Sequence, residues 1–261
     1  MKILVFPDIH GRTFWHKPFT ELIESVDGCV FLGDYVDPYS HEGISNEDAL
    51  VNLQDIISTV TPYHEKCVML AGNHDLHYID DMFYDYARGS RYSNFFARRY
   101  GEQLNMLNTV YAHMIHGRDI DILFTHAGIN KHWFMHHQDK EINEGDIILF
   151  PNDELFEHYD ECYKNKSIAD ILNETHDTPK FRALCEIGRY RGGYDYAGGP
   201  EWNDISEISF TDGGNLPYSK NVFQIFGHTQ LRDAIILENF ACIDCHHAFL
   251  LDTNTLKLEK L

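Results

Sequence analysis

The sequence lacks any long hydrophobic run. No stretch approaches the ~18 apolar residues that a membrane-spanning helix requires. The first apolar run, Ile3–Phe6, ends at Pro7 and Asp8 and is too short for the core of a secretory signal. We therefore predict a cytoplasmic protein that does not bind membranes. In that reducing compartment the six cysteines are expected to be thiols rather than disulfides.

Positive charge is also scarce. The chain has 21 Lys and Arg residues against 41 Asp and Glu residues, a formal net charge of −20. A field of this sign repels nucleic acid, so nonspecific nucleic-acid binding is not expected. Hydrophobic residues make up 43% of the chain, which is ordinary for a globular protein and too much for a disordered one.

No internal repeat, low-complexity tract or proline-rich linker divides the 261 residues. This continuity favours a single domain over residues 1–261. The part around 130–218 is the least regular, and we interpret it as an insertion on the substrate side. It includes a glycine-rich and aromatic segment, Gly188–Trp202, which is typical of a substrate-side loop.

Short apolar runs alternate with helix-like stretches. Five runs read as strands buried on both faces: Ile3–Phe6, Cys29–Leu32, Cys67–Leu70, Ile122–Phe124 and Val222–Phe226. Apolar residues at helical spacing predict helices over Asn46–Val60, with Asn46 as the N-cap, and over Ser93–Leu107. This alternation predicts an α/β sheet with helices on its faces.

The C-terminal part has a different pattern, with short apolar runs separated by turn residues. These runs predict antiparallel strands: Ala234–Leu237, Phe240–Ile243, Ala248–Leu251 and Leu256–Leu258. The chain thus combines a parallel part with an antiparallel end.

Polar, chemically capable residues follow each of the five buried-strand candidates. The five segments are Asp8-Ile9-His10-Gly11, Gly33-Asp34-Tyr35-Val36-Asp37, Gly72-Asn73-His74-Asp75, Thr125-His126-Ala127-Gly128 and Gly227-His228-Thr229. Ligands bind at the carboxyl ends of strands in open α/β sheets, so these segments are expected to meet at one edge.

The residue types predict a metal centre. Carboxylate, imidazole and amide groups suit Mn²⁺, Fe or Zn²⁺, and the five segments offer no thiolate. Six such groups are too many for one cation, but two cations that share a carboxylate accommodate them. Two metals about 3.5–4 Å apart can clamp a phosphoryl group during in-line displacement.

The order DxH, GDxxD, GNHD, THAG, GHT, from Asp8 to Thr229, resembles the calcineurin-like metallophosphoesterase superfamily. It is most similar to the branch of serine/threonine phosphoprotein phosphatases and diadenosine tetraphosphatases, including small bacterial and phage members. The resemblance implies a four-layer α-β-β-α sandwich and two divalent or trivalent transition-metal ions, with Mn favoured over Fe or Zn.

The resemblance also implies a role for each motif residue. Asp8 and His10 would hold the first metal and Asp34 would bridge both. The ligands of the second metal would be Asn73, His126 and His228. A metal-bridging hydroxide would attack phosphorus directly. His74 would act as general acid, oriented by a hydrogen bond to Asp37.

Two departures from the family pattern matter. Many protein phosphatases have a phosphate-binding Arg directly after GDxxD, where this chain has Pro38. Guanidinium groups suit this role, and the candidate replacements are Arg12, Arg88, Arg91, Arg189 and Arg191. Many relatives read GHxH where this chain has Gln230; either Gln230 supplies an oxygen to the first metal or water takes its place.

The expected activity is hydrolysis of phosphoric monoesters. The phosphorylated substrate is a phosphoprotein, a nucleotide or a small phosphoester, and the sequence predicts no oligomeric state. The first alternative is a phosphodiesterase or dinucleotide polyphosphatase with the same metal site. The remote alternative, a non-catalytic binding scaffold, predicts gaps among the ligand positions, and the sequence has none.

Overall fold

The structure is a computed structural model that describes residues 1–79, 93–137, 167–176, 180–209 and 222–261. The chain divides into two compact units. The first is formed by Met1–Val110, Phe226–Ile236 and Cys242–Leu261, and the second by Tyr111–Ile225 and Leu237–Ala241. The single domain with an insertion around 130–218 stays a prediction. Among the described residues, no helix has the length and apolar character to cross a membrane.

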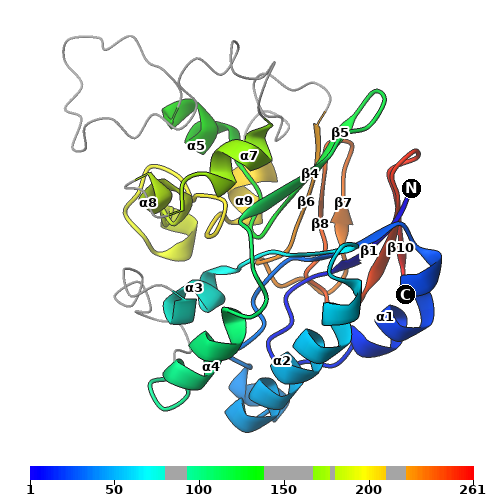
Figure 1. Ribbon diagram of the computed structural model, residues 1–261. Helices are drawn as coiled ribbons and strands as arrows, with labels where there is room; N and C mark the ends of the chain where they lie inside the picture. The colour runs from blue at the N-terminus through cyan, green and yellow to red at the C-terminus, as the bar shows by residue number, and fades with distance from the viewer. Residues whose placement is uncertain (80–92, 138–166, 177–179, 210–221) are drawn as a thin grey trace. The chain divides into compact units, whose positions relative to one another are not determined.

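A five-stranded sheet lies in the first unit (Figure 1). Its strand order is β10 (Lys257–Lys260), β9 (Phe249–Asp252), β1 (Lys2–Phe6), β2 (Gly28–Phe31) and β3 (Cys67–Met69). The strands β1, β2 and β3 are parallel, whereas β9 is antiparallel to both β1 and β10. This sheet confirms the predicted combination of parallel strands with an antiparallel C-terminal end.

Four helices among the described residues belong to the same unit: α1 (His16–Leu22), α2 (Asn46–Val60), α3 (Asn73–Ile79) and α4 (Ala97–Leu104). Short 3₁₀ turns lie at Ile23–Ser25, Ser40–Glu42 and Thr61–Tyr63. Apolar residues of α1, α2 and α4 form one core cluster with residues of β1 and β2. At its centre the rings of Phe6 and Phe31 are 4.5 Å apart. Burial of such rings stabilises this unit, because it removes apolar surface from water.

The predicted bounds of α2 are confirmed, but the predicted cap is wrong. Ser45, rather than Asn46, is the N-cap: its side chain accepts a hydrogen bond from Asp48 N–H, and the Asp48 side chain accepts one from Ser45 N–H. Ser45 has extended backbone geometry, as an N-cap requires. This reciprocal capping box satisfies two N–H groups at the start of the helix.

The second predicted helix is shorter than expected. It begins at Ala97 and ends at Leu104, whereas the pattern predicted Ser93–Leu107. Residues 94–96 form a turn instead. Phe96 and Leu107 lie outside the helix but are buried in the same core cluster. Their apolar side chains continue the helical spacing in the sequence, which made the predicted helix too long.

The second unit contains a sheet with the order β4 (Ala112–Ile115), β5 (Asp121–Thr125), β6 (Val222–Phe226) and β8 (Phe240–Cys242). The strand β5 is antiparallel to β4 and parallel to β6. Its described helices are α5 (Lys131–His136), α7 (Ile168–Asn173), α8 (Phe181–Leu184) and α9 (Ile205–Ser209), with a 3₁₀ turn at Arg189–Arg191. The strand β7 (Ile235–Ile236) follows β8 as the fifth strand in the order of this sheet, although its residues are grouped with the first unit.

The strand β4 was not predicted from the sequence. Only the first of its four residues is buried, so it has no apolar run. Asn173 at the end of α7 holds this strand, because its side-chain oxygen accepts from the N–H groups of Tyr111 and Ala112. Its amide nitrogen donates to the Ala112 carbonyl.

Candidate functional site

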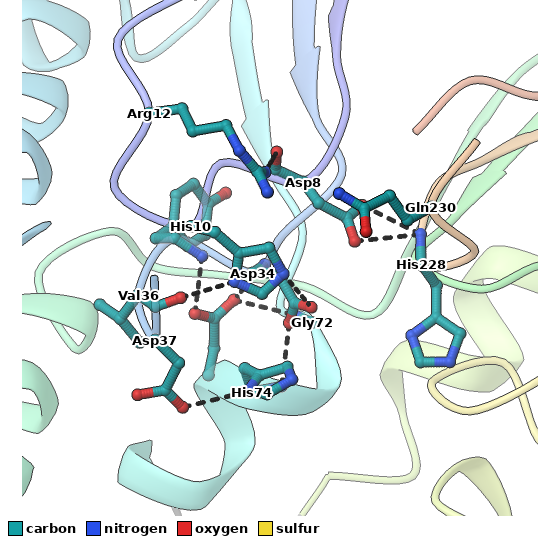
Figure 2. Close-up of polar contacts among 12 residues, drawn as sticks. Asp8, His10, Arg12, Asp34, Val36, Asp37, Gly72, His74, His228 and Gln230 are labelled. Carbon is teal, nitrogen blue, oxygen red and sulfur yellow. Dashed lines mark hydrogen bonds and ion pairs between the residues drawn. The ribbon is translucent and has the colours of Figure 1, made fainter. Parts of the chain in front are cut away.

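Seven of the predicted metal-binding and catalytic residues lie in the first unit. All seven are buried: Asp8, His10, Asp34, Asp37, Asn73, His74 and His228. They come from segments that follow β1, β2, β3 and β6, and Figure 2 shows the polar contacts among several of them. The strands β1, β2 and β3 are parallel neighbours in one sheet, so the segments that follow them start at the same edge of that sheet.

The backbone at these positions is strained. His10, Asp34, Asp37 and His228 have φ angles of 45°, 53°, 57° and 62°. Only seven non-glycine residues in the described part of the chain have positive φ, and four of them are predicted site residues. Such conformations are rare for residues with a Cβ atom and gather at functional sites.

His10, Asp34 and His74 lie close enough to bind one metal ion. Their candidate ligand atoms all lie within 4.8 Å of one another. His10 Nε2 is 3.4 Å from Asp34 Oδ2, and the rings of His10 and His74 meet edge to face at 5.1 Å. The other oxygen of Asp34, Oδ1, accepts a hydrogen bond of 2.9 Å from His74 N–H.

The orientation of His10 is fixed by the loop after β2. Its Nδ1 lies 2.8 Å from the carbonyl oxygen of Val36. A carbonyl oxygen only accepts, so Nδ1 carries the proton and Nε2 keeps its lone pair. Metal-binding histidines are commonly oriented through this kind of contact.

Asp8 and His228 are joined although 220 positions separate them. Both carboxylate oxygens of Asp8 accept from His228 N–H, at 3.0 and 3.1 Å. Gly227 is required for this approach, because a Cβ atom there would lie 2.1 Å from Asp8 Oδ1. The GHT motif therefore needs its glycine for contact with the carboxylate of the first motif.

His74 and Asp37 form a buried pair. His74 Nδ1 lies 3.0 Å from Asp37 Oδ2, and Asp37 is fully buried. Because the carboxylate accepts, Nδ1 is the donor and Nε2 is left as the second ring nitrogen. The Tyr78 hydroxyl donates a hydrogen bond to the other carboxylate oxygen of Asp37, Oδ1.

Asp75 has a structural role that was not predicted from the sequence. Its two oxygens accept hydrogen bonds from the backbone N–H groups of Asp34, Tyr35 and Gly72. Burial and the charge of Asp34 raise the pKa of Asp75 well above its usual range. Asp75 belongs to the GNHD motif, which was the available signal, but two of its three partners lie 40 and 41 positions away.

His126 lies in the second unit, directly after β5, and is fully buried. Its loop is held by a distant segment: Ala127 N–H donates to the Pro200 carbonyl, and Asn203 donates to the Ala127 carbonyl. Asn130, the N-cap of α5, donates to the side chains of Asn203 and Glu207. The glycine-rich segment is therefore bound to the THAG loop. The role of His126 as a ligand stays a prediction.

The candidate arginines have different surroundings. Arg12 is buried and makes a bidentate ion pair with Glu42, at 2.9 and 2.8 Å, and also donates to the Asp8 carbonyl. Burial alone would raise the pKa of the Glu42 carboxyl, but the ion pair with Arg12 outweighs this effect and the pKa is lowered. Arg191 pairs with Asp204 at 2.9 Å, and Arg189 is exposed. Arg88 and Arg91 lie outside the described residues, and the phosphate-binding role of each arginine stays a prediction.

Gln230 contacts another histidine. Its side-chain Nε2 lies 2.9 Å from His246 Nε2, and Figure 2 draws Gln230 beside Asp8 and His228. His246 has a φ angle of 60°, a further strained residue in the first unit. Burial and the charge of Arg12 lower the pKa of His246.

The donor set of the first unit fits transition-metal ions. Asp8, Asp34, His10 and His228 offer carboxylates and imidazoles from positions nine-tenths or more buried. Buried carboxylates are costly without positive charge nearby, and this oxygen and nitrogen set suits Mn²⁺, Fe or Zn²⁺. The residues therefore fit a metal centre, with the identity of the metals open.

The family model described as calcineurin-like phosphoesterase matches residues 1–231. The chain belongs to the calcineurin-like phosphoesterase family. No curated protein matches this phosphoesterase. Members of the family are metal-dependent hydrolases of phosphate esters, so the observed donor set has the chemistry that the family requires.

Solved structures with similar folds are distant in sequence. A cold-active protein tyrosine phosphatase has a TM-score of 0.52 at 16% identity, over all of this chain and 78% of that one. A protein serine/threonine phosphatase from Saccharomyces cerevisiae has a TM-score of 0.49 at 15% identity, over all of this chain and 79% of that one. The first likeness, the family match and the two mixed sheets confirm the predicted α/β sandwich fold of this phosphoesterase.

Proposed function

We propose that this phosphoesterase hydrolyses phosphoric monoesters at a dinuclear metal centre, with His74 as the general acid. The observation that carries the proposal is the arrangement of His74. Its ring meets the ring of His10 edge to face at 5.1 Å, and its Nδ1 is bound to the buried Asp37, which keeps this nitrogen from a metal ion. A general acid has to be oriented beside the reacting group in this way.

The chain's own residues have distinct parts in this proposal. Asp8, His10, Asp34, Asn73 and His228 are the proposed ligands from the first unit, and the resemblance adds His126. When bound, the metal ions act as Lewis acids that stabilise charge on the phosphoryl group and activate water. His74 Nε2 donates a proton to the leaving-group oxygen. Asp37 holds the Nδ1–H tautomer and stabilises the charged imidazolium before the transfer.

A monoester substrate is favoured over a diester by Gln230. The resemblance associates GHxH with nuclease relatives, and this chain has Gln230 in place of the second His. The net charge of −20 also disfavours DNA as a substrate.

A paired assay tests the proposal. Protein reconstituted with Mn²⁺ is given p-nitrophenyl phosphate and bis-p-nitrophenyl phosphate separately, and kcat/KM is measured for each. We expect a clear preference for the monoester. A preference for the diester would make the protein a phosphodiesterase, and no hydrolysis of either ester by metal-loaded protein would contradict the proposal. Omission of Mn²⁺ is the control.

A further inference from the structure

Tyr78 shares a helix face with His74. The two residues lie four positions apart on α3, so their side chains project from neighbouring turns of the same face. Both side chains contact one carboxylate. His74 Nδ1 lies 3.0 Å from Asp37 Oδ2, and the Tyr78 hydroxyl donates to Asp37 Oδ1.

The direction of the Tyr78 hydroxyl is fixed. A hydroxyl has one proton to donate, and the Tyr78 oxygen already accepts a hydrogen bond of 2.9 Å from Ser93 N–H. The proton is therefore directed to Asp37. The ring is held as well, because it packs edge to face on Tyr100 with 5.1 Å between the centroids, and Tyr100 is fully buried.

The consequence concerns how Asp37 holds the imidazole. A carboxylate bound through only one oxygen can rotate about its Cβ–Cγ bond. Here a donor on each oxygen fixes that rotation, and with it the plane of the His74 ring. A displacement of a catalytic group by as little as about 1 Å can lower the reaction rate about 100-fold.

We propose that Tyr78 is a positioning residue for the general acid, so that Tyr78, Asp37 and His74 work as a hydrogen-bonded chain. The proposal rests on the proposed function, because it assumes that His74 protonates the leaving group. It assigns Tyr78 no contact with the substrate.

The test uses leaving groups that need the acid to different degrees. Phenolate is a poorer leaving group than p-nitrophenolate, so phenyl phosphate depends more on proton transfer. For Tyr78→Phe we expect kcat on phenyl phosphate to fall about tenfold, as for the loss of a hydrogen bond to a charged group. The rate on p-nitrophenyl phosphate should fall less than about twofold.

Tyr100→Phe is the matched control. It also removes one phenolic hydroxyl and keeps the ring, but that hydroxyl contacts Asn46 rather than the pair. We expect it to leave the ratio of the two rates unchanged. Replacement of Tyr78 by p-aminophenylalanine, which restores a donor, should restore the wild-type ratio. Equal losses on both esters for Tyr78→Phe, or no loss on either, would overturn the proposal.

A second readout needs neither metal nor activity. The Nδ1–H proton of His74, assigned by its absence in His74→Asn, should give a low-field NMR resonance because it donates to a buried carboxylate. We expect this resonance to move or broaden in Tyr78→Phe but not in Tyr100→Phe. A wild-type spectrum without it, or one unchanged in Tyr78→Phe, would overturn the proposal. If wild-type protein hydrolyses neither ester, the proposed function is wrong, and the resonance alone decides whether Tyr78 positions His74.

Discussion

Single buried carboxylates in the first unit hold backbone segments together in addition to their proposed chemistry. Asp8 accepts from His228 N–H, Asp34 accepts from His74 N–H, and Asp75 accepts from three N–H groups. All of these contacts except the one from Gly72 N–H join two strand-end loops that are distant in sequence. Of the three, only Asp75 has no direct part in the proposed reaction, so the positions of the candidate ligands depend on a carboxylate outside the ligand set.

We expect Asp75→Ala to destabilise the protein by at least about 3 kcal/mol, because it leaves three buried N–H groups without their acceptor. Asp75→Asn should destabilise it too: whichever way the amide is placed, its NH₂ group faces a backbone N–H. Urea unfolding measures both effects. Asp55→Ala, at an exposed acid on α2, is the control and should change stability by less than about 0.5 kcal/mol. An Asp75→Ala variant as stable as this control would contradict the assignment.

At the scale of elements, the sequence predicted best where burial is continuous. The strands β1, β2 and β6 are almost fully buried, so their apolar runs matched the structure. The strand β4 was missed because most of it is only partly buried. The motif residues were found because each follows a strand. Tyr78 was not, because its contact with Asp37 spans 41 positions and only the folded chain brings the two together.

The capping box of α2 gives a prediction at this scale. Ser45→Ala should destabilise the protein by about 1 kcal/mol, because Asp48 N–H loses its acceptor. Ser58→Ala, at an exposed position inside the same helix, is the control and should cost less than about 0.5 kcal/mol. Chemical denaturation of the two variants measures the difference. Equal stability of the two would show that the cap contributes nothing.

His113, on the strand β4, makes the unfolding free energy of the protein depend on pH. Burial lowers the pKa of His113, so the unfolded chain binds a proton more readily than the folded one. The contribution of His113 to the unfolding free energy is therefore fully present above the pKa of the unfolded chain, about 6.5, and is lost as the pH falls below it. His113→Gln should flatten the decrease in unfolding free energy between about pH 6.5 and 5. An unchanged pH profile in this variant would contradict the effect.

At the scale of the whole molecule, metal binding should stabilise the fold. A ligand at 100 times its Kd adds about 2.7 kcal/mol to the unfolding free energy. We expect EDTA to lower the midpoint of thermal unfolding and Mn²⁺ to restore it. Asp34→Ala should show no shift with Mn²⁺, because Asp34 belongs to the candidate ligand group. The same Mn²⁺ shift in wild type and variant would mean that the metal binds elsewhere.

The central claim is that one set of residues holds metal while His74 supplies the proton. The most direct measurement compares metal content and the rate of p-nitrophenyl phosphate hydrolysis in Asp34→Ala and His74→Asn. We predict that Asp34→Ala loses both metal and activity. His74→Asn should keep its metal and lose about 10²- to 10⁴-fold in rate. Equal loss of metal in the two variants would contradict the separation of roles, and full activity in His74→Asn would contradict the general acid.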